Sequence, residues 1–282
     1  MSDLGKGMRM YERELQTALE AVRLAGDFLV KAYADFQVIP NAPASITTDA
    51  DRQSQEIILQ RIIRDFPGDA LCAEEATASV RVGAHTGPRL WIVDPIDGTR
   101  GFAMKNGEFS VMVGFVDNGA IGVGVVAQPV PANHAAGRLT YAVRGAGCWR
   151  IDGPNEEPQR CQVTNVADLA QATLTQSRSR NPGQKSRYLT ALQPARVLES
   201  YSAGLKLALV ARGEADVYLN TYDAFHDWDI CAGHILVTEA GGEVTGIKGE
   251  TLVYGLPEAW QRAGLLASNG KIHQAAIGKM KV

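Results

Sequence analysis

The run from Trp91 to Thr99, Trp-Ile-Val-Asp-Pro-Ile-Asp-Gly-Thr, constrains the fold more than any other part of the 282-residue chain. Three apolar residues predict a buried strand, and Asp94 and Asp97 follow it, with a proline stiffening the chain between them. Both carboxylates can then face one point, with the Ile96 carbonyl as a third oxygen. Mg²⁺ prefers such hard oxygen ligands, so the run predicts a strand that ends in a magnesium site.

The last two residues of this run suit a phosphate group. If Gly98 and Thr99 open a helix, its first N–H groups have no partner within the helix and offer a phosphate seat beside the metal. The alternative is an ordinary turn after a strand, because aspartate, proline and glycine are common turn residues.

The composition argues against several classes of protein. A net charge of −3 with well-mixed charges gives no basic surface for a nucleic-acid polymer. No apolar stretch approaches ~20 residues, so no membrane span is expected. The first residues also lack the apolar core of a signal peptide. Cysteines at four scattered positions, without the spacing of a metal site, indicate a reduced, cytoplasmic protein.

The first half of the chain predicts helices and antiparallel strands. Apolar residues recur at helical spacing over residues 12–34 and 51–65. From residue 109 to 128 the period changes to two around Asp117-Asn-Gly119, which is typical of a hairpin. Further strands are expected near residues 139–143 and 147–151.

The second half alternates strands with helices, as in an α/β protein. A segment rich in proline and acidic residues, 153–158, predicts the boundary between an α+β half, residues 1–155, and an α/β half, residues 156–282. Strands are expected near residues 172–176, 196–199 and 216–219, and helices near residues 184–192, 203–212 and 229–240.

Three further acidic segments could join the predicted magnesium site. The segment Thr48-Asp-Ala-Asp51 begins the second expected helix, where either aspartate could simply be an N-cap. Glu74 and Glu75 end a short apolar run; they could be surface acids, yet a buried glutamate is costly unless it is paired or binds a metal. Asp229 opens a helix of small and apolar residues, which could equally be a capped core helix.

Together and in this order, the four segments resemble those of the inositol-monophosphatase-like superfamily of Mg²⁺-dependent, Li⁺-sensitive phosphatases. The matching motifs are Thr-Asp-Ala-Asp, Glu-Glu, Trp-Ile-Val-Asp-Pro-Ile-Asp-Gly-Thr and Trp-Asp-x-x-Ala-Gly, and the resemblance extends to about Gly246. It implies a layered αβαβα sugar-phosphatase fold. It also implies a phosphomonoesterase that uses metal-activated water and forms no covalent intermediate.

The resemblance assigns a role to each motif residue. Asp51 and Thr99 would orient and deprotonate the attacking water, and Glu74 would share the ion that activates it. The amides of Gly98 and Thr99 would bind the phosphoryl oxygens. The implied Mg²⁺ ligands are Glu74, Asp94, the Ile96 carbonyl, Asp97 and Asp229.

Within the superfamily, the chain looks most like the 3′(2′),5′-bisphosphate nucleotidases, which remove the 3′-phosphate of adenosine 3′,5′-bisphosphate. The resemblance rests on the segments 102–111, Ser177-Arg-Ser179 and Tyr201-Ser-Ala-Gly-Leu-Lys206. A second phosphate calls for a fixed cation away from the metal, for which Lys206 and Arg178 are candidates; Lys206 could instead be a solvated helix residue. The expected substrate contacts are Gly98, Thr99, Ser177, Arg178, Ser202, Lys206, Tyr222 and Asp229.

Two positions bear on the choice of substrate. Inositol monophosphatases carry a glutamate seven residues before the last metal aspartate, where it meets sugar hydroxyls, and this position is Tyr222 here. An aromatic ring suits a flat base. However, the serine of the nucleotidase branch three residues before the lysine is Ala203, although Ser202 is adjacent.

Two alternatives therefore stay open. One is a phosphatase of inositol or other small sugar monophosphates, and a remoter one is a non-catalytic metal- or phosphate-binding regulator. The intact acidic set disfavours the regulator, because clustered carboxylates without a cation repel one another. A small-molecule phosphate ester is the expected partner of a monomer or homodimer.

Overall fold

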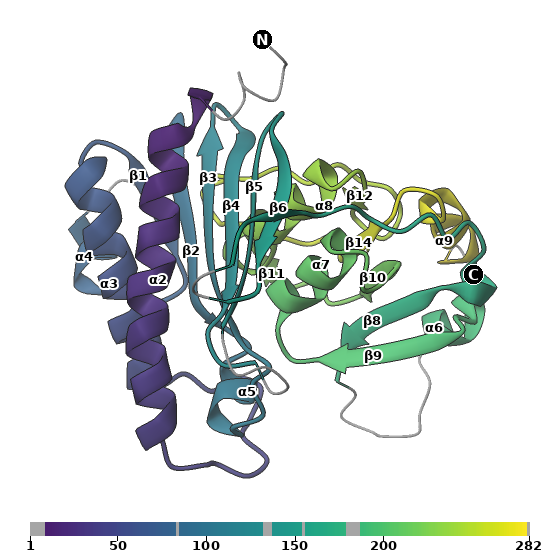
Figure 1. The fold of residues 1–282 in the computed structure, drawn as a ribbon, viewed down its shortest axis with the longest axis horizontal. Helices are drawn as coiled ribbons and strands as arrows, with labels where there is room; N and C mark the ends of the chain where they lie inside the picture. The colour runs from purple at the N-terminus through teal and green to yellow at the C-terminus, as the bar shows by residue number, and fades with distance from the viewer. Residues whose placement is uncertain (1–8, 83–84, 132–136, 154–155, 179–186, 281–282) are drawn as a thin grey trace.

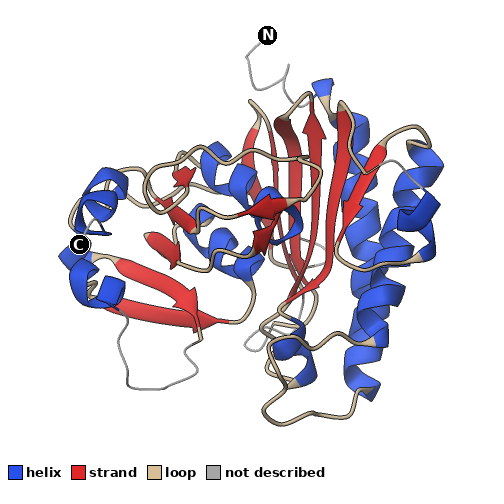
Figure 2. Ribbon diagram, turned by 180° about the vertical axis from the view of Figure 1, so that it is seen from behind, coloured by secondary structure: helices blue, strands red, loops and turns tan. Residues whose placement is uncertain are grey.

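The computed structural model describes residues 9–82, 85–131, 137–153, 156–178 and 187–280, and the structural statements below concern these residues. Two sheets alternate with three layers of helices along the long axis of the molecule (Figures 1 and 2). The expected αβαβα architecture is confirmed.

The first helical layer contains α2 (Glu12–Asp35) and α3 (Asp49–Asp65), with the short α4 (Ala78–Val82) beside them. Thr48, and not either aspartate, is the N-cap of α3: its side chain accepts the Ala50 N–H, while the Asp51 carboxylate accepts the Thr48 N–H. This reciprocal pair satisfies two N–H groups at once, which a single aspartate cap would not do.

The first sheet has β1 parallel to β2 and every later neighbour antiparallel. Asn118 and Gly119 both adopt positive φ, 48° and 80°, so the predicted hairpin turn is confirmed. The strands, in sheet order, are β1 (Ala70–Ala73), β2 (Arg89–Asp97), β3 (Ser110–Asp117), β4 (Ala120–Gln128), β5 (Arg138–Val143), β6 (Gly147–Ile151) and β7 (Gln159–Arg160).

Both faces of this sheet are buried. Val113 and Phe115 of β3 pack into the core under α2 and α3, whereas Met112 and Val116, on either side of them in the sequence, pack into the core on the other face. From Val111 to Val116 the strand therefore carries no polar side chain, whereas a half-buried strand would alternate apolar and polar ones. The predicted boundary at residue 155 stays a prediction, and this sheet continues to Arg160.

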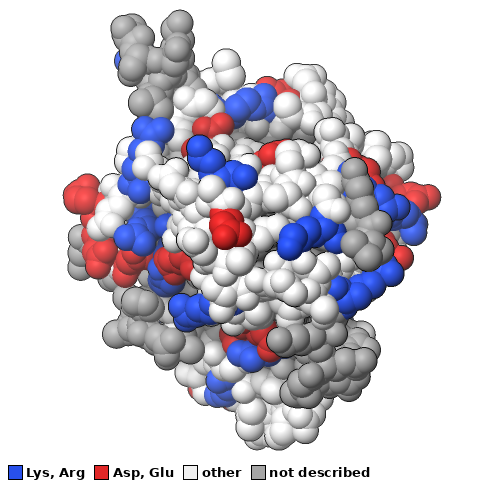
Figure 3. Space-filling model, turned by 90° about the vertical axis from the view of Figure 1, so that its right-hand side faces the viewer, with Lys and Arg blue, Asp and Glu red and all other residues white. Residues whose placement is uncertain are grey.

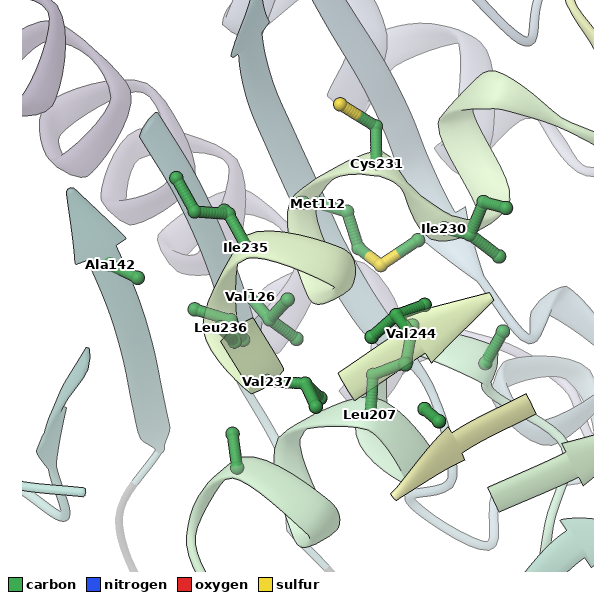
Figure 4. Close-up of a cluster of buried hydrophobic side chains, with 14 of the residues drawn as sticks. Met112, Val126, Ala142, Leu207, Ile230, Cys231, Ile235, Leu236, Val237 and Val244 are labelled. Carbon is green, nitrogen blue, oxygen red and sulfur yellow. The ribbon is translucent and has the colours of Figure 1, made fainter. Parts of the chain in front are cut away.

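Two helices, α7 (Ala203–Ala211) and α8 (Asp227–Glu239), form the layer between the sheets. Figure 4 shows the apolar side chains of α8 between residues of β3, β4 and β5 and those of α7 and β12 (Glu243–Thr245). Glycines allow this close packing: a Cβ at Gly124 would lie 2.4 Å from the Ala232 carbonyl oxygen, and a Cβ at Gly233 would lie 2.7 Å from the Leu207 Cβ.

The second sheet has the order β12-β14-β10-β8-β9. Its outer face is covered by α6 (Arg187–Leu192) and α9 (His273–Met280). The three strands predicted for the second half of the chain are confirmed within one residue at each end. Of the helix predicted over residues 184–192, residues 184–186 lie outside the described residues. The remaining elements are β8 (Thr173–Ser177), β9 (Arg196–Ser200), β10 (Val217–Asn220), β14 (Leu265–Ser268), the ribbon of β11 (Phe225–His226) and β13 (Trp260–Gln261), α5 (Thr99–Ala103) and the 3₁₀ turn Leu169–Gln171.

Surface charges are mixed. On the described part of the face in Figure 3, basic side chains lie among acidic and uncharged ones rather than in one band. No helix in the described part of the chain is both long and apolar enough to span a membrane.

Candidate active site

Strand pairing explains why the acidic segments meet. Because β1 runs parallel to β2 with Ala73 paired to Val93, Glu74 and Asp94 leave the same edge of the sheet. Glu74 N–H donates to the Val93 carbonyl at 3.3 Å. The pairing of β2 with β3 is irregular between Asp94 and Asp97, where the chain bends away from the ladder.

Glu74 and Asp94 form the most strongly perturbed pair. The two carboxyl groups interact, and the negative charge of Glu74 disfavours ionisation of Asp94. Glu74 opens to solvent in the cleft, but the surrounding protein removes much of the water around its carboxyl group. This desolvation, together with repulsion from Asp229 and Asp51, raises the pKa of Glu74 to about 8. The pKa of Asp94, 2% exposed, is raised well above its usual range by burial and then by Glu74.

Asp51 reaches the site through Thr99. Its Oδ1 accepts the Thr99 hydroxyl at 2.8 Å, and its Oδ2 accepts the backbone N–H and hydroxyl of Thr48 at 2.7 and 2.6 Å. Burial nevertheless raises the pKa of Asp51. The Thr99 hydroxyl also lies 3.0 Å from the Ile96 carbonyl, the predicted backbone ligand.

Asp97 faces the start of α7. Its carboxylate accepts the N–H groups of Ala203 and Gly204 at 3.0 and 2.7 Å, and the hydroxyls of Ser110 and Ser202. Three of these four bonds end on Oδ2, so Oδ1 keeps one acceptor position free for another ligand. Burial raises the pKa of Asp97, opposed by Lys206 and these hydrogen bonds.

Lys206 is an internal lysine rather than a solvated one. Its side chain is completely buried, and Nζ donates to the Ser200 and Tyr201 carbonyls at 2.8 and 3.3 Å. Burial lowers its pKa to about 8, opposed by the negative charge of Asp97. The lysine therefore offsets part of the negative charge of Asp97 and fixes the turn before α7.

Asp229 stands one turn into α8. The helix begins at Asp227, two residues earlier than expected, so Asp229 is its third residue. The Oδ2 atom of Asp229 accepts the His226 N–H at 2.6 Å. An acidic residue at this position completes the helix start. Its side chain lines the same cleft as Glu74 and Asp94.

A cleft of about 500 Å³ joins these residues. Eleven of the predicted site residues line it, whereas Asp51 and Ser202 do not: Asp51 lies behind Thr99, and the fully buried Ser202 is the N-cap of α7. The predicted residues on its wall are Glu74, Asp94, Ile96, Asp97, Gly98, Thr99, Ser177, Arg178, Lys206, Tyr222 and Asp229.

The sequence reasoning missed other residues on the same wall. Arg100 and Tyr201 line the cleft, as do Asn220 and the segment 44–47. Asn220 donates to the Ser177 hydroxyl at 3.2 Å. Arg100 could have been suspected from its place directly after Thr99, and Tyr201 from its place at the start of the segment that ends at Lys206.

Arg178 is paired with an acid. Two of its three nitrogens, Nε and Nη2, donate to the Glu108 carboxylate, with Nε at 2.7 Å, and Glu108 also accepts the Tyr201 N–H at 3.2 Å. Glu108 thus ties the end of β8 to the turn before α7. Ser179, in the same predicted segment, lies outside the described residues.

The acidic donors fit a divalent cation in charge and in ligand type. None of the described Lys or Arg side chains forms an ion pair with Glu74 or Asp94, so their repulsion is relieved only by protons. Over the described ranges, no three acidic, histidine or cysteine side chains lie close enough, as they stand, to hold one ion. An all-oxygen set with excess negative charge nevertheless suits Mg²⁺ once side chains rotate toward one point.

The chain is similar to known proteins along most of its length. A sequence model described as the Inositol monophosphatase family matches residues 10–281. The histidinol-phosphatase of Mycobacterium tuberculosis is 31% identical over 87% of this chain and 88% of its own. The 3′(2′),5′-bisphosphate nucleotidase CysQ of Escherichia coli strain K12 is 29% identical over 90% of this chain and 99% of its own.

The fold is also shared with solved structures. The inositol monophosphatase of Anabaena superimposes with a TM-score of 0.76 at 29% identity, covering 96% of each chain. The similar proteins carry names for different substrates, so the comparisons leave the substrate of this chain open.

Proposed function

Because this chain belongs to the inositol monophosphatase family and is a phosphoric monoester hydrolase, we propose that its substrate is a nucleoside 3′,5′-bisphosphate, from which it removes the 3′-phosphate. One observation carries the proposal: the cleft that holds the carboxylates is also lined by three basic residues, Arg100, Arg178 and Lys206. A monophosphate of a neutral sugar needs no such second group of charges. Tyr201 and Tyr222 on the same wall offer rings to a flat base.

The proposal makes the enzyme Mg²⁺-dependent. The ligands would be Glu74, Asp94, the Ile96 carbonyl, Asp97 through its free Oδ1 position, and Asp229. Bound there, the ion would lower the pKa of water and stabilise negative charge on the ester oxygens. Sensitivity to Li⁺ is part of the same proposal.

The residues of the chain would handle the proton. Thr99 would orient the attacking water, accept its proton at Oγ1 and pass its own hydroxyl proton to Asp51 Oδ1, the existing 2.8 Å contact. The raised pKa of Asp51 suits a group that must take up a proton. The amides of Gly98 and Thr99 would hold phosphoryl oxygens, so the displacement needs no covalent intermediate.

The predicted substrate contacts divide into direct and indirect ones. Ser177, Tyr222 and Asp229 line the cleft and would touch the substrate. Lys206 would act mainly through its charge, because its ammonium donates to two carbonyls. Ser202 would act by holding Asp97, since its hydroxyl donates to that carboxylate.

The test is phosphate release with Mg²⁺ from three substrates side by side: adenosine 3′,5′-bisphosphate, inositol 1-phosphate and histidinol phosphate. We expect kcat/KM to favour the nucleotide by about a hundredfold, roughly 2.7 kcal/mol of transition-state discrimination. A preference for either of the other substrates would refute the nucleotide proposal. No phosphate release from any ester would favour the non-catalytic alternative.

The setting of the enzyme is also proposed. The four cysteines are free and buried, which suits a reducing compartment such as the cytoplasm. We expect a monomer or a homodimer, which sedimentation would distinguish.

A further inference from the structure

The three basic residues of the cleft differ in how they are neutralised. Arg178 is bound on two nitrogens by Glu108, and the ammonium of Lys206 donates to two carbonyls and is stabilised by the negative charge of Asp97. Both groups are therefore already held by contacts within the protein, which leaves them less able than an unpaired cation to bond a ligand directly.

Arg100 has no such partner among the residues that the structure describes. It forms no ion pair within the described ranges, and its Nε is shielded from solvent without a hydrogen-bond acceptor. The guanidinium carbon lies 5.0 Å from the centroid of the Tyr201 ring, and Arg178 lies 5.6 Å from the same ring. Stacking on tyrosine holds the planar fork in place, while leaving its N–H groups available to an anion.

The position of Arg100 separates it from the phosphate that is hydrolysed. Its backbone follows Thr99 at the catalytic end of α5, but its side chain contacts Tyr201, which belongs to the turn before α7. It pairs with none of Glu74, Asp94 and Asp97, the acids beside which that phosphate would bind.

We propose that Arg100 is a specificity-determining residue that binds the second, unhydrolysed phosphate of the substrate through its free N–H groups. This inference rests on the proposed function and sharpens it, because it assigns the main contact to Arg100 rather than to Lys206 or Arg178. A guanidinium binds phosphate through two parallel hydrogen bonds, and its buried unpaired Nε is a donor that such a phosphate would satisfy.

The experiment compares adenosine 3′,5′-bisphosphate with adenosine 3′-monophosphate, which has the same scissile ester and lacks only the second phosphate. Both are assayed with the wild-type protein, Arg100→Gln and Arg100→Lys. Lys105→Gln is the matched control, because it removes one positive charge just after α5 from a half-buried side chain that bonds the Ala34 carbonyl outside the cleft. Inhibition by adenosine 5′-monophosphate adds a readout that does not depend on turnover of that ligand.

We expect Arg100→Gln to lower kcat/KM for the bisphosphate by about 10- to 100-fold, the range for a charged hydrogen bond, and to change the monophosphate value less than threefold. Inhibition by adenosine 5′-monophosphate should weaken by a similar factor. Arg100→Lys should give an intermediate ratio of kcat/KM for the bisphosphate to kcat/KM for the monophosphate. This variant allows the same comparison if Arg100→Gln does not fold. Lys105→Gln should leave the ratio unchanged.

Two results would overturn the inference alone. In one, the wild type prefers the bisphosphate and Arg100→Gln keeps that preference. In the other, Arg100→Gln slows both substrates equally, which would place Arg100 on the hydrolysed phosphate. A wild type that does not discriminate between the two nucleotides would instead refute the proposed function, and the inference with it.

Discussion

Replacing Asp94 by Asn should stabilise the protein in the absence of divalent ions and abolish its activity in their presence. Asp94 is buried beside Glu74, with no basic partner among the described residues. Asn has nearly the same volume, and its amide oxygen can still accept the Ile96 N–H that Asp94 Oδ1 accepts at 3.1 Å. At a pH where both carboxyl groups are ionised, the substitution therefore removes a charge and little else.

The size of the effect follows from the repulsion that is removed. Two unit charges ~4 Å apart interact by ~4 kcal/mol at an effective dielectric constant of ~20. Solvent in the cleft reaches Glu74 and screens part of this, which leaves a gain of about 1–3 kcal/mol in the free energy of unfolding. For a protein of this size, that is a rise in Tm of roughly 2–10 °C.

Thermal unfolding with EDTA at about pH 8.5, where the wild-type Glu74 is ionised, measures this difference. Asp69→Asn is the matched control. Asp69 accepts two bonds from Arg89 at 2.9 and 3.0 Å and one from Trp91 at 2.9 Å, so its loss should destabilise by about 1–3 kcal/mol. Added Mg²⁺ should raise the Tm of the wild type more than that of Asp94→Asn, and kcat of the variant should fall at least ~10³-fold.

A loss of stability in Asp94→Asn as large as that in Asp69→Asn would refute the reasoning, because Asp94 would then be a compensated charge. Near-normal turnover would refute its assignment as a ligand. These two failures are independent of each other.

Three further predictions follow from contacts at the site. Thr99→Ala should lower kcat by about 10²-fold in steady-state assays while KM changes less than threefold, because the hydroxyl that Asp51 accepts acts on the nucleophile. Ser202→Ala should lower the free energy of unfolding by about 1–2 kcal/mol in urea titrations, since the Leu205 N–H loses its cap at 2.9 Å. The pKa of Glu74 rises from 4.5 to about 8 on folding, so the folded form holds more protons in that window. Stability in EDTA should therefore fall as pH rises from about 4.5 to 8, and Mg²⁺ affinity measured by calorimetry should rise.

Much of the fold could be predicted from local pattern. The Asn118-Gly119 turn between alternating apolar runs sets the hairpin of β3 and β4, because both residues must adopt positive φ. The buried run before Asp94 predicts a strand, and Pro95 with Gly98 predicts the turn after it. These features depend on residues near in sequence, which is why sequence alone specifies them.

The contacts between the two halves could not be predicted in this way. The bonds of Asp97 to the start of α7 join residues more than a hundred positions apart, and so does the stacking of Arg100 on Tyr201. The burial of Lys206 could not be predicted either, because the apolar pattern of α7 assigns this residue neither to a buried nor to an exposed face. Such pairings depend on how the layers pack, and no local signal carries that information.

The glycines beneath α8 make catalysis sensitive to changes far from the cleft. A Cβ at Gly124 would meet the Ala232 carbonyl oxygen at 2.4 Å, about 1 Å inside ordinary contact, and one at Gly114 would meet the Cys231 sulfur at 2.8 Å. The helix would have to shift by a similar amount and carry Asp229 with it. A displacement of ~1 Å at a reacting group can cost about 10²-fold in rate. Natural variants at these glycines could therefore be folded, abundant and inactive, with every residue of the active site intact.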